Sequence, residues 1–377
     1  MPTRRTVLAA LPLLAGCSRT LTPYPMDPLP FTPGSGLFLE VGGKTLLAET
    51  SGERVPGQPF TADTPFRVAS ISKLAVARLA EVLAANGVLD LEADVGPRLG
   101  IPLRHPAFPN APVTLAHLLS HRSGIRDPEA YWVAAPGDIR TLLTPAIFAP
   151  DAEPGRFFRY SNLNYGIIAT VMEAATDTRF DRLAARVLPE GSGFNWSGAD
   201  PASASPLWRG TPGAWEAQVD APPITAPTIL TEPGLDRSAY LATYTPGTNG
   251  TLFSPQGGLR ASFTHLLQIA RDLPDAPPLW DSATDPGDTG DGHFQQFGLG
   301  RYHYPADRSP LPGLRLIGHA GEAYGFYGGV WRAPDIDAVM AFGTLGSPPE
   351  GVPMTGGSPN LRTTTAAVFA RIRAALP

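Results

Sequence analysis

A serine and a lysine three positions apart, Ser70 and Lys73, form the pattern in this sequence with the most direct chemistry. The residues from Ser70 to Asn86 are dense in alanine, leucine and valine and are followed by Gly87, which predicts a buried helix. Side chains at this spacing face the same way on a helix. The free N–H groups and partial positive charge of a helix N-terminus stabilise an alkoxide and lower the pKa of a nearby amine. The pair therefore predicts a serine nucleophile whose proton passes to the lysine.

The rarity of lysine strengthens this prediction. Of the 29 basic residues only Lys44 and Lys73 are lysines, and the others are arginines. Arginine does not lose its proton in proteins, so a site that needs a neutral amine requires lysine. The competing interpretation is an exposed lysine that follows a capping serine.

A second pattern joins Tyr160 and Asn162, which lie two positions apart and far beyond Ser70 in the chain. The phenol can transfer a proton, and the carboxamide can orient the amide of a substrate. On its own this pattern means little, because a tyrosine and an asparagine in a turn are usually structural.

A third pattern, His319 and Gly321, ends an apolar segment that is typical of a strand. A glycine in an edge strand lets a ligand approach the backbone closely. The N–H group of the next residue, Glu322, could then pair with that of Ser70 as an oxyanion hole. Alone, His319 would more often be a structural histidine.

The three patterns, in this order, resemble those of the superfamily of class C beta-lactamases, DD-peptidases and family VIII esterases. The resemblance extends from Gly36 to the last helix, and flanking segments are similar too: Phe66 to Ala69, Leu118 to Ile125 and Pro255 to Leu259. It implies an acyl-enzyme mechanism without a cofactor. Ser70 would be the nucleophile, Lys73 and Tyr160 the general base, Asn162 a substrate-orienting group and His319 an electrostatic aid.

The residues at the third pattern indicate which substrate such an enzyme would take. Beta-lactamases of this group usually carry Lys-Thr-Gly where this chain has His319-Ala320-Gly321, and that lysine and threonine help to hold a carboxylate. Glu322 adds a negative charge beside the same strand, unless an arginine such as Arg301 or Arg332 compensates. We therefore expect a neutral ester or amide, or a substrate with a free amine. The alternatives are a D-Ala-D-Ala carboxypeptidase or beta-lactamase, and a non-catalytic surface lipoprotein that binds peptide.

The elements that must position these residues predict an α+β fold. Strand-like segments occur at both ends of the chain and helical segments lie between them, which indicates an antiparallel sheet flanked by helices with an inserted helical subdomain. We expect the sheet domain to comprise residues 36–85 and 250–377, and the helical, loop-rich subdomain to comprise residues 86–249. The strands are expected at 36–40, 44–49, 298–303, 315–319, 327–332 and 338–345. Further helices are expected at 114–120, 165–175, 180–187, 263–273 and 361–376. Residues 189–257 show no periodicity and are expected to form a wall or cap over the site.

The first seventeen residues have the order of an export signal: Arg4 and Arg5, an apolar run from Val7 to Leu14, and Cys17. This run is shorter than the roughly 20 residues that span a bilayer. Leu-Ala-Gly-Cys resembles a bacterial lipobox, which would make Cys17 a lipidated anchor and residues 18–35 a tether. This predicts an exported lipoprotein that faces the periplasm or cell surface of a bacterium. The alternative is an ordinary signal peptide with an incidental cysteine.

Composition excludes several other classes. The net charge of −5 and the lack of basic clusters argue against a nucleic acid partner. A single cysteine leaves no disulfide and no thiolate metal site. His117 and His121 are four positions apart, but neither has the neighbouring glutamate of a zinc protease, so no metal is expected. The expected partners are therefore a small-molecule or peptide substrate and, through the lipid, a membrane.

Overall fold

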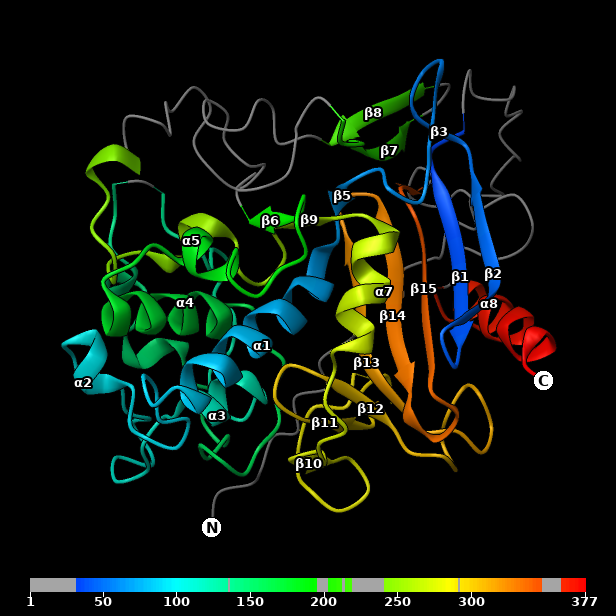
Figure 1. Ribbon diagram of the computed structural model, residues 1–377. Coiled ribbons are helices and arrows are strands. Elements are labelled where there is room, and N and C mark those ends of the chain that lie inside the picture. The colour runs from blue at the N-terminus through cyan, green and yellow to red at the C-terminus, as the bar shows by residue number, and fades with distance from the viewer. Residues whose placement is uncertain are drawn as a thin grey trace, which may run out of the picture.

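An eight-stranded antiparallel sheet lies beside a group of helices (Figure 1). The computed structural model describes residues 32–134, 136–194, 203–211, 214–218, 241–290, 292–347 and 361–377, so Cys17 and the export signal lie outside the described residues. In spatial order the strands are β10 (Trp280–Asp281), β11 (Gln296–Phe297), β12 (Tyr302–Tyr304), β13 (Leu316–Ala323), β14 (Phe326–Ala333), β15 (Ala338–Thr344), β1 (Ser35–Val41) and β2 (Lys44–Ser51). The sheet thus joins strands from both ends of the described chain, and the predicted fold class is confirmed.

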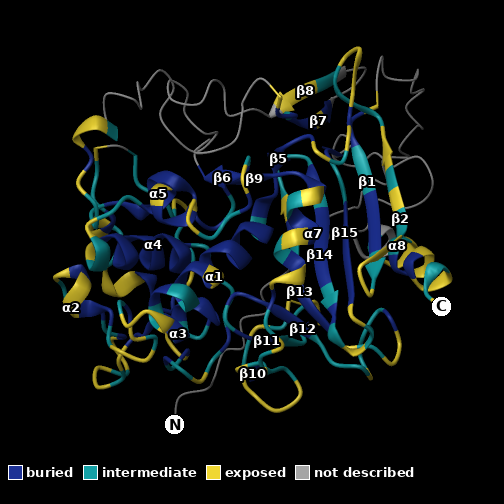
Figure 2. Ribbon diagram, viewed as in Figure 1, coloured by how far each residue is buried: buried dark blue, intermediate teal, exposed yellow. Residues whose placement is uncertain are grey.

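Successive side chains of a strand point to opposite faces of the sheet, and both kinds of position are apolar in its central strands. A helix therefore packs on each face. On one face Phe38 packs against Phe263 of helix α7 (Phe263–Arg271), with ring centroids 5.1 Å apart. On the other face Phe342 packs against Phe369 of helix α8 (Leu361–Ala375), with ring centroids 5.7 Å apart. Figure 2 shows the central strands buried and β2 exposed along its outer edge.

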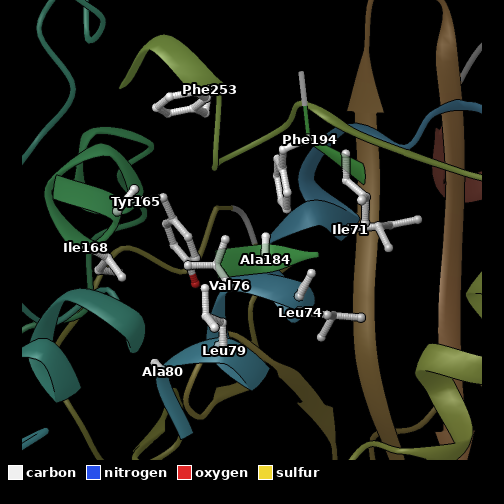
Figure 3. Close-up of a cluster of buried hydrophobic side chains, with 14 of the residues drawn as sticks. Ile71, Leu74, Val76, Leu79, Ala80, Tyr165, Ile168, Ala184, Phe194 and Phe253 are labelled. Carbon is white, nitrogen blue, oxygen red and sulfur yellow. The ribbon is translucent and has the colours of Figure 1, made fainter. Parts of the chain in front are cut away.

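Helix α1 (Ser72–Ala85) lies between the sheet and a group of further helices, and its first half is buried (Figures 1 and 2). Its apolar side chains meet those of helices α4 (Leu163–Thr176) and α5 (Phe180–Ala184) in a continuous core (Figure 3). Gly87, with φ +70°, follows the helix where the sequence predicts its end. The surrounding helices are α2 (Gly96–Leu99), α3 (Leu115–Leu119), α4 (Leu163–Thr176) and α5 (Phe180–Ala184). Short 3-10 turns are η1 (Ala69–Ile71), η2 (Ile139–Thr141), η3 (Pro145–Ile147), η4 (Gly250–Phe253) and η5 (Pro334–Ile336).

Two expectations need correction. Residues 298–303 do not form one strand, because residues 298–301 connect β11 to β12, which pair as a hairpin. Residues 189–257 are not wholly irregular in their described part. They contain β6 (Gly193–Phe194), β7 (Leu207–Thr211) and β8 (Ala214–Gln218). Strand β6 joins a small sheet with β9 (Leu259–Ala261) and β5 (Phe66–Arg67), and β7 and β8 form another with β16 (Gly346–Ser347). A third small sheet, β3 (Glu53–Val55) with β4 (Gln58–Pro59), lies outside this segment.

A buried carboxyl group, Glu173, joins α4 to the start of α5 and to the segment of residues 244–247. It accepts hydrogen bonds from the N–H of Phe180 (2.8 Å), the hydroxyl of Tyr244 (2.6 Å) and the N–H of Gly247 (3.0 Å). Burial raises the pKa of Glu173 to about 7, although these three donors act in the opposite direction. The folded protein therefore binds this proton more tightly than the unfolded chain does.

We predict that Glu173 makes the protein less stable as the pH rises from about 4.5 to about 7. Relative to Glu173→Gln, the wild type should lose up to about 3 kcal/mol of unfolding free energy across this range. Urea unfolding at pH 5 and pH 8 measures this difference. Asp177→Asn, an exposed carboxyl at the end of the same helix, is the matched control. Equal pH slopes for the wild type and Glu173→Gln would contradict the prediction.

Candidate active site

Ser70 lies in the tight turn η1, immediately before α1. The preceding residue, Ala69, has φ +48°, in the left-handed region that residues with a side chain rarely adopt. Such backbone strain is common at functional sites. The turn leaves the Ser70 side chain half-buried at the edge of a cleft.

Lys73 lies one turn further along and is completely buried. Its Nζ atom donates hydrogen bonds to Ser70 Oγ (3.1 Å), Asn162 Oδ1 (2.9 Å) and the carbonyl oxygen of Gln256 (2.8 Å). These acceptors match the three protons of an ammonium group. Burial nevertheless lowers the pKa of Lys73 to about 7, and the nearby carboxylate of Asp127 opposes this shift. The amine can therefore hold or release a proton near neutral pH.

Tyr160 lies on the other side of the Lys73 amine, which is 4.9 Å from the centre of the tyrosine ring. The ring is stacked between those of His121 and Phe294, with centroid separations of 4.2 and 5.3 Å. Burial raises the pKa of Tyr160 above its ordinary value, and a hydrogen bond with Ser70 acts against that shift. The phenol therefore stays protonated near neutral pH and contacts the hydroxyl group of Ser70.

Asp127 is a residue of this site that the sequence patterns did not reveal. Its carboxylate accepts hydrogen bonds from the backbone N–H groups of Asn162 (2.9 Å) and Leu163 (2.9 Å), at the start of α4. It also accepts from the hydroxyl of Ser161 (2.7 Å) and from Asn162 Nδ2 (3.0 Å). Because Nδ2 is bound to Asp127, Oδ1 of Asn162 is turned toward Lys73. A lone aspartate just after the Ser-Gly-Ile segment was the only available signal.

His121 supports the loop that carries Tyr160 and Ser161. It adopts φ +56°, and its Nδ1 atom accepts a hydrogen bond from the N–H of Ser161 (3.1 Å). Burial, followed by the proximity of Lys73 and His319, lowers the pKa of His121 well below its ordinary value. A neutral imidazole that accepts from the backbone and stacks on Tyr160 is a structural group. The structure contains no cluster of three or more His, Asp or Glu residues able to hold a metal, within the part of the chain that it describes.

His319 is close to the site but does not line the cleft. It is fully buried, and its ring centroid is 4.4 Å from that of Tyr302 and 6.5 Å from that of Tyr160. Burial and the proximity of Lys73 lower the pKa of His319 well below its ordinary value, so the imidazole is neutral. Any electrostatic aid from His319 would therefore come without a positive charge.

Gly321 lines the cleft, and its lack of a side chain is also needed for packing. A Cβ atom at this position would lie 2.6 Å from the carbonyl oxygen of Val68 and 3.1 Å from Ile71. The glycine therefore lets strand β13 lie directly against the turn that carries Ser70. Strand β12 pairs with β13 only up to Gly318, so residues 319–323 present a free strand edge on the side of that turn.

The cleft beside Ser70 has a volume of about 800 Å³ and is largely aromatic. Glu322, an exposed residue of β13, is among the residues that line it. No lysine or arginine lines it among the described residues. The two arginines named above as compensating charges have partners elsewhere: Arg301 is buried in an ion pair with Glu81, and Arg332 donates to the carbonyl oxygen of Leu273.

Comparison with known proteins agrees with this geometry. The family model named Beta-lactamase matches residues 26–355. The chain belongs to the Beta-lactamase family. Members of this family are hydrolases, and the resemblance inferred from the three patterns is confirmed at this level.

The curated proteins that match this chain are similar to it at modest sequence identity and over only part of their length. Penicillin-binding protein 4* of Bacillus subtilis (strain 168) is 30% identical over 145 residues, which are 36% of this chain and 31% of that protein. The matched region spans about a third of the length of the curated relatives.

Solved structures share the fold. An octameric penicillin-binding protein homologue from Pyrococcus abyssi has a TM-score of 0.63 and 19% identity, and the match covers 90% of this chain and 73% of that chain. The D-amino acid amidase from Ochrobactrum anthropi SV3, in complex with L-phenylalanine, has a TM-score of 0.62 and 16% identity, with 91% and 94% covered. At such identities the likeness establishes the fold alone.

We predict that Lys73→Arg lowers kcat/KM by roughly 10²–10⁴-fold, because arginine keeps the charge but cannot accept a proton. In the wild type, kcat/KM should fall as the pH decreases through about 7, where Lys73 becomes protonated. Initial rates with a neutral ester between pH 5 and 9 measure both effects. Lys44→Arg, at the other lysine, should change neither. Comparable activity of Lys73→Arg and the wild type would contradict the prediction.

We predict that Asp127→Asn lowers kcat more than it raises KM. Asn162 loses its hydrogen bonds to the carboxylate, and both Asn162 and its partner Lys73 are then misplaced. Removing the carboxylate also removes the charge that raises the pKa of Lys73, so the acidic limb of the pH profile should move to lower pH. The exposed Glu129, changed to Gln, is the control on the same loop. An unchanged limb would reduce Asp127 to a purely structural role.

Proposed function

We propose that this protein is an exported serine hydrolase that cleaves an ester or amide through an acyl-enzyme. The observation that carries the proposal is the contact between Ser70 and Lys73, an amine whose pKa is lowered to about 7 by burial. A neutral amine next to a hydroxyl is the arrangement that activates a serine nucleophile.

In the acylation step, Ser70 Oγ attacks the substrate carbonyl while its proton passes to Lys73, directly or through Tyr160. The tetrahedral oxyanion would be bound by the N–H groups of Ser70 and Glu322. The carbonyl then re-forms, the bond to the alcohol or amine breaks, and the leaving group takes the proton from the same pair. The close packing of Gly321 on the turn of Ser70 supports this placement of the oxyanion hole.

In the deacylation step, a water molecule takes the place of the leaving group. Lys73 accepts the proton of this water, directly or by relay through Tyr160, while the water oxygen attacks the acyl carbonyl; the proton then returns to Ser70 Oγ as the carboxylic acid leaves. Lys73 and Tyr160 act as one coupled proton-transfer system, so the titration belongs to the pair. Asn162 would hold the substrate amide or the acyl carbonyl while its Oδ1 atom keeps contact with Lys73.

The charge of the cleft supports a neutral or amine-bearing substrate. Glu322 lines the cleft, and no cationic lysine or arginine accompanies it there among the described residues. A substrate carboxylate would lie near that negative charge without a lysine or arginine of the described chain to balance it. This disfavours penicillins and peptides that end in D-Ala as substrates, even though a penicillin-binding protein and a beta-lactamase are among the relatives. The named D-amino acid amidase supports an amide as one candidate.

A non-catalytic binding protein is the second possibility. It would gain nothing from a fully buried lysine held against a serine, since burial of an amine costs free energy unless it is paired. The intact contacts among Ser70, Lys73 and Tyr160 therefore favour an enzyme.

The cellular location is also part of the proposal. The order of charge, apolar run and Cys17 supports export and a lipid anchor that faces the periplasm or cell surface, with a membrane as partner. Among the described residues no helix has both the length and the apolar character needed to cross a membrane.

We predict that a fluorophosphonate adds one covalent label to the purified protein, and that Ser70→Ala abolishes it. A fluorescent penicillin should label poorly, because of the charge of Glu322. Intact-mass spectrometry measures both reactions. Efficient labelling by the penicillin would restore the carboxypeptidase or beta-lactamase function, and absence of any label would favour the binding protein.

A further inference from the structure

The cleft at Ser70 continues along the sheet toward helix α8. Strand pairing aligns Ala320, Gly329 and Phe342 across β13, β14 and β15. The same cleft is lined by Ser70 and by Thr365 and Phe369 of α8, so the space beside Ser70 reaches that helix. Ala320 and Phe342 both line the cleft.

The far part of this cleft, here called the trough, has an aromatic floor. A Cβ atom on Gly329 would lie 2.6 Å from Trp331 Nε1 and 3.1 Å from the ring of Phe342, so these two rings occupy the space above the glycine. Tyr304 borders the floor, with its ring centroid 5.1 Å from that of Trp331.

Helix α8 covers the trough from the other side. Thr365, Ala366 and Phe369 line it, and the hydroxyl of Thr365 is hydrogen-bonded to that of Tyr327 on β14. This bond ties the helix to the sheet at the edge of the trough. Aromatic side chains and a small alanine leave an apolar space, of the kind that takes the apolar part of a small molecule.

The floor is tightly packed at Trp331. Its indole is 2% exposed, and its Nε1 atom has almost no accessible surface and lies against Gly329. Trp331 therefore offers an occupant of the trough its ring and not its N–H group.

We propose that the trough is a subsite for an apolar, aromatic group attached to the ester or amide that Ser70 attacks. This rests on the proposed function for the attachment, but the binding itself does not require catalysis. The group can belong to the acyl part or to the alcohol or amine part of the substrate, since both extend from the same carbonyl.

The binding test uses the Ser70→Ala protein and 1-naphthol as the probe, measured by isothermal titration calorimetry. Saturable binding is expected, with at least roughly tenfold weakening by Ala366→Trp, which fills the trough. Ala367→Trp, at the next exposed position of α8 and outside the cleft, is the matched control and should leave binding unchanged.

The turnover test compares three esters in a pH-stat: ethyl acetate, ethyl 4-phenylbutanoate and 2-(1-naphthyl)ethyl acetate. The wild type should prefer one aromatic ester by at least roughly tenfold in kcat/KM, and Ala366→Trp should abolish the preference. The preferred ester shows whether the acyl or the alcohol part enters the trough.

The two tests fail in different ways. Absence of saturable naphthol binding, or equal binding by the Ala366→Trp and Ala367→Trp proteins, would overturn the subsite. Naphthol binding that depends on the trough, together with no turnover of any ester and no phosphonate label, would retain the subsite and overturn the proposed function.

Discussion

The arrangement of this site depends on one buried amine. Lys73 has no exposed surface, and its three hydrogen bonds join a side chain of α1 to Ser70, to the start of α4 and to the backbone near η4. Burial disfavours the ammonium form, while the three acceptors and Asp127 favour it, and the balance places its pKa near 7. A small change in any of these contacts would therefore change which proton state prevails.

The rest of the fold keeps this amine in place. Asp127 holds the start of α4 and turns Asn162 toward Lys73. The ring of His121 stacks on the ring of Tyr160 and supports it. Strand β13 can lie against the turn of Ser70 because Gly321 has no side chain. Its free edge borders the cleft, and the cleft reaches α8.

Sequence reasoning predicted what depends on local pattern. The helix after Ser70 and the long strands have clear apolar periodicity, and the side chains of Ser70, Lys73, Tyr160 and Asn162 do come together. It did not reveal Asp127, whose partners lie 34 to 36 positions away in the chain. The shortest strands were missed for the same reason, because two or three residues carry no periodicity and pair only with distant segments.

The state of Lys73 can be observed directly, because the chain has only two lysines. Labelling with ¹³Cε-lysine gives two side-chain signals, which Lys44→Arg assigns, and their chemical shifts can be followed from pH 5 to 10. The Lys73 signal should titrate with a midpoint near 7 in the free protein. A Lys73 side chain that stays fully protonated up to pH 9 would contradict its function as the base that activates Ser70.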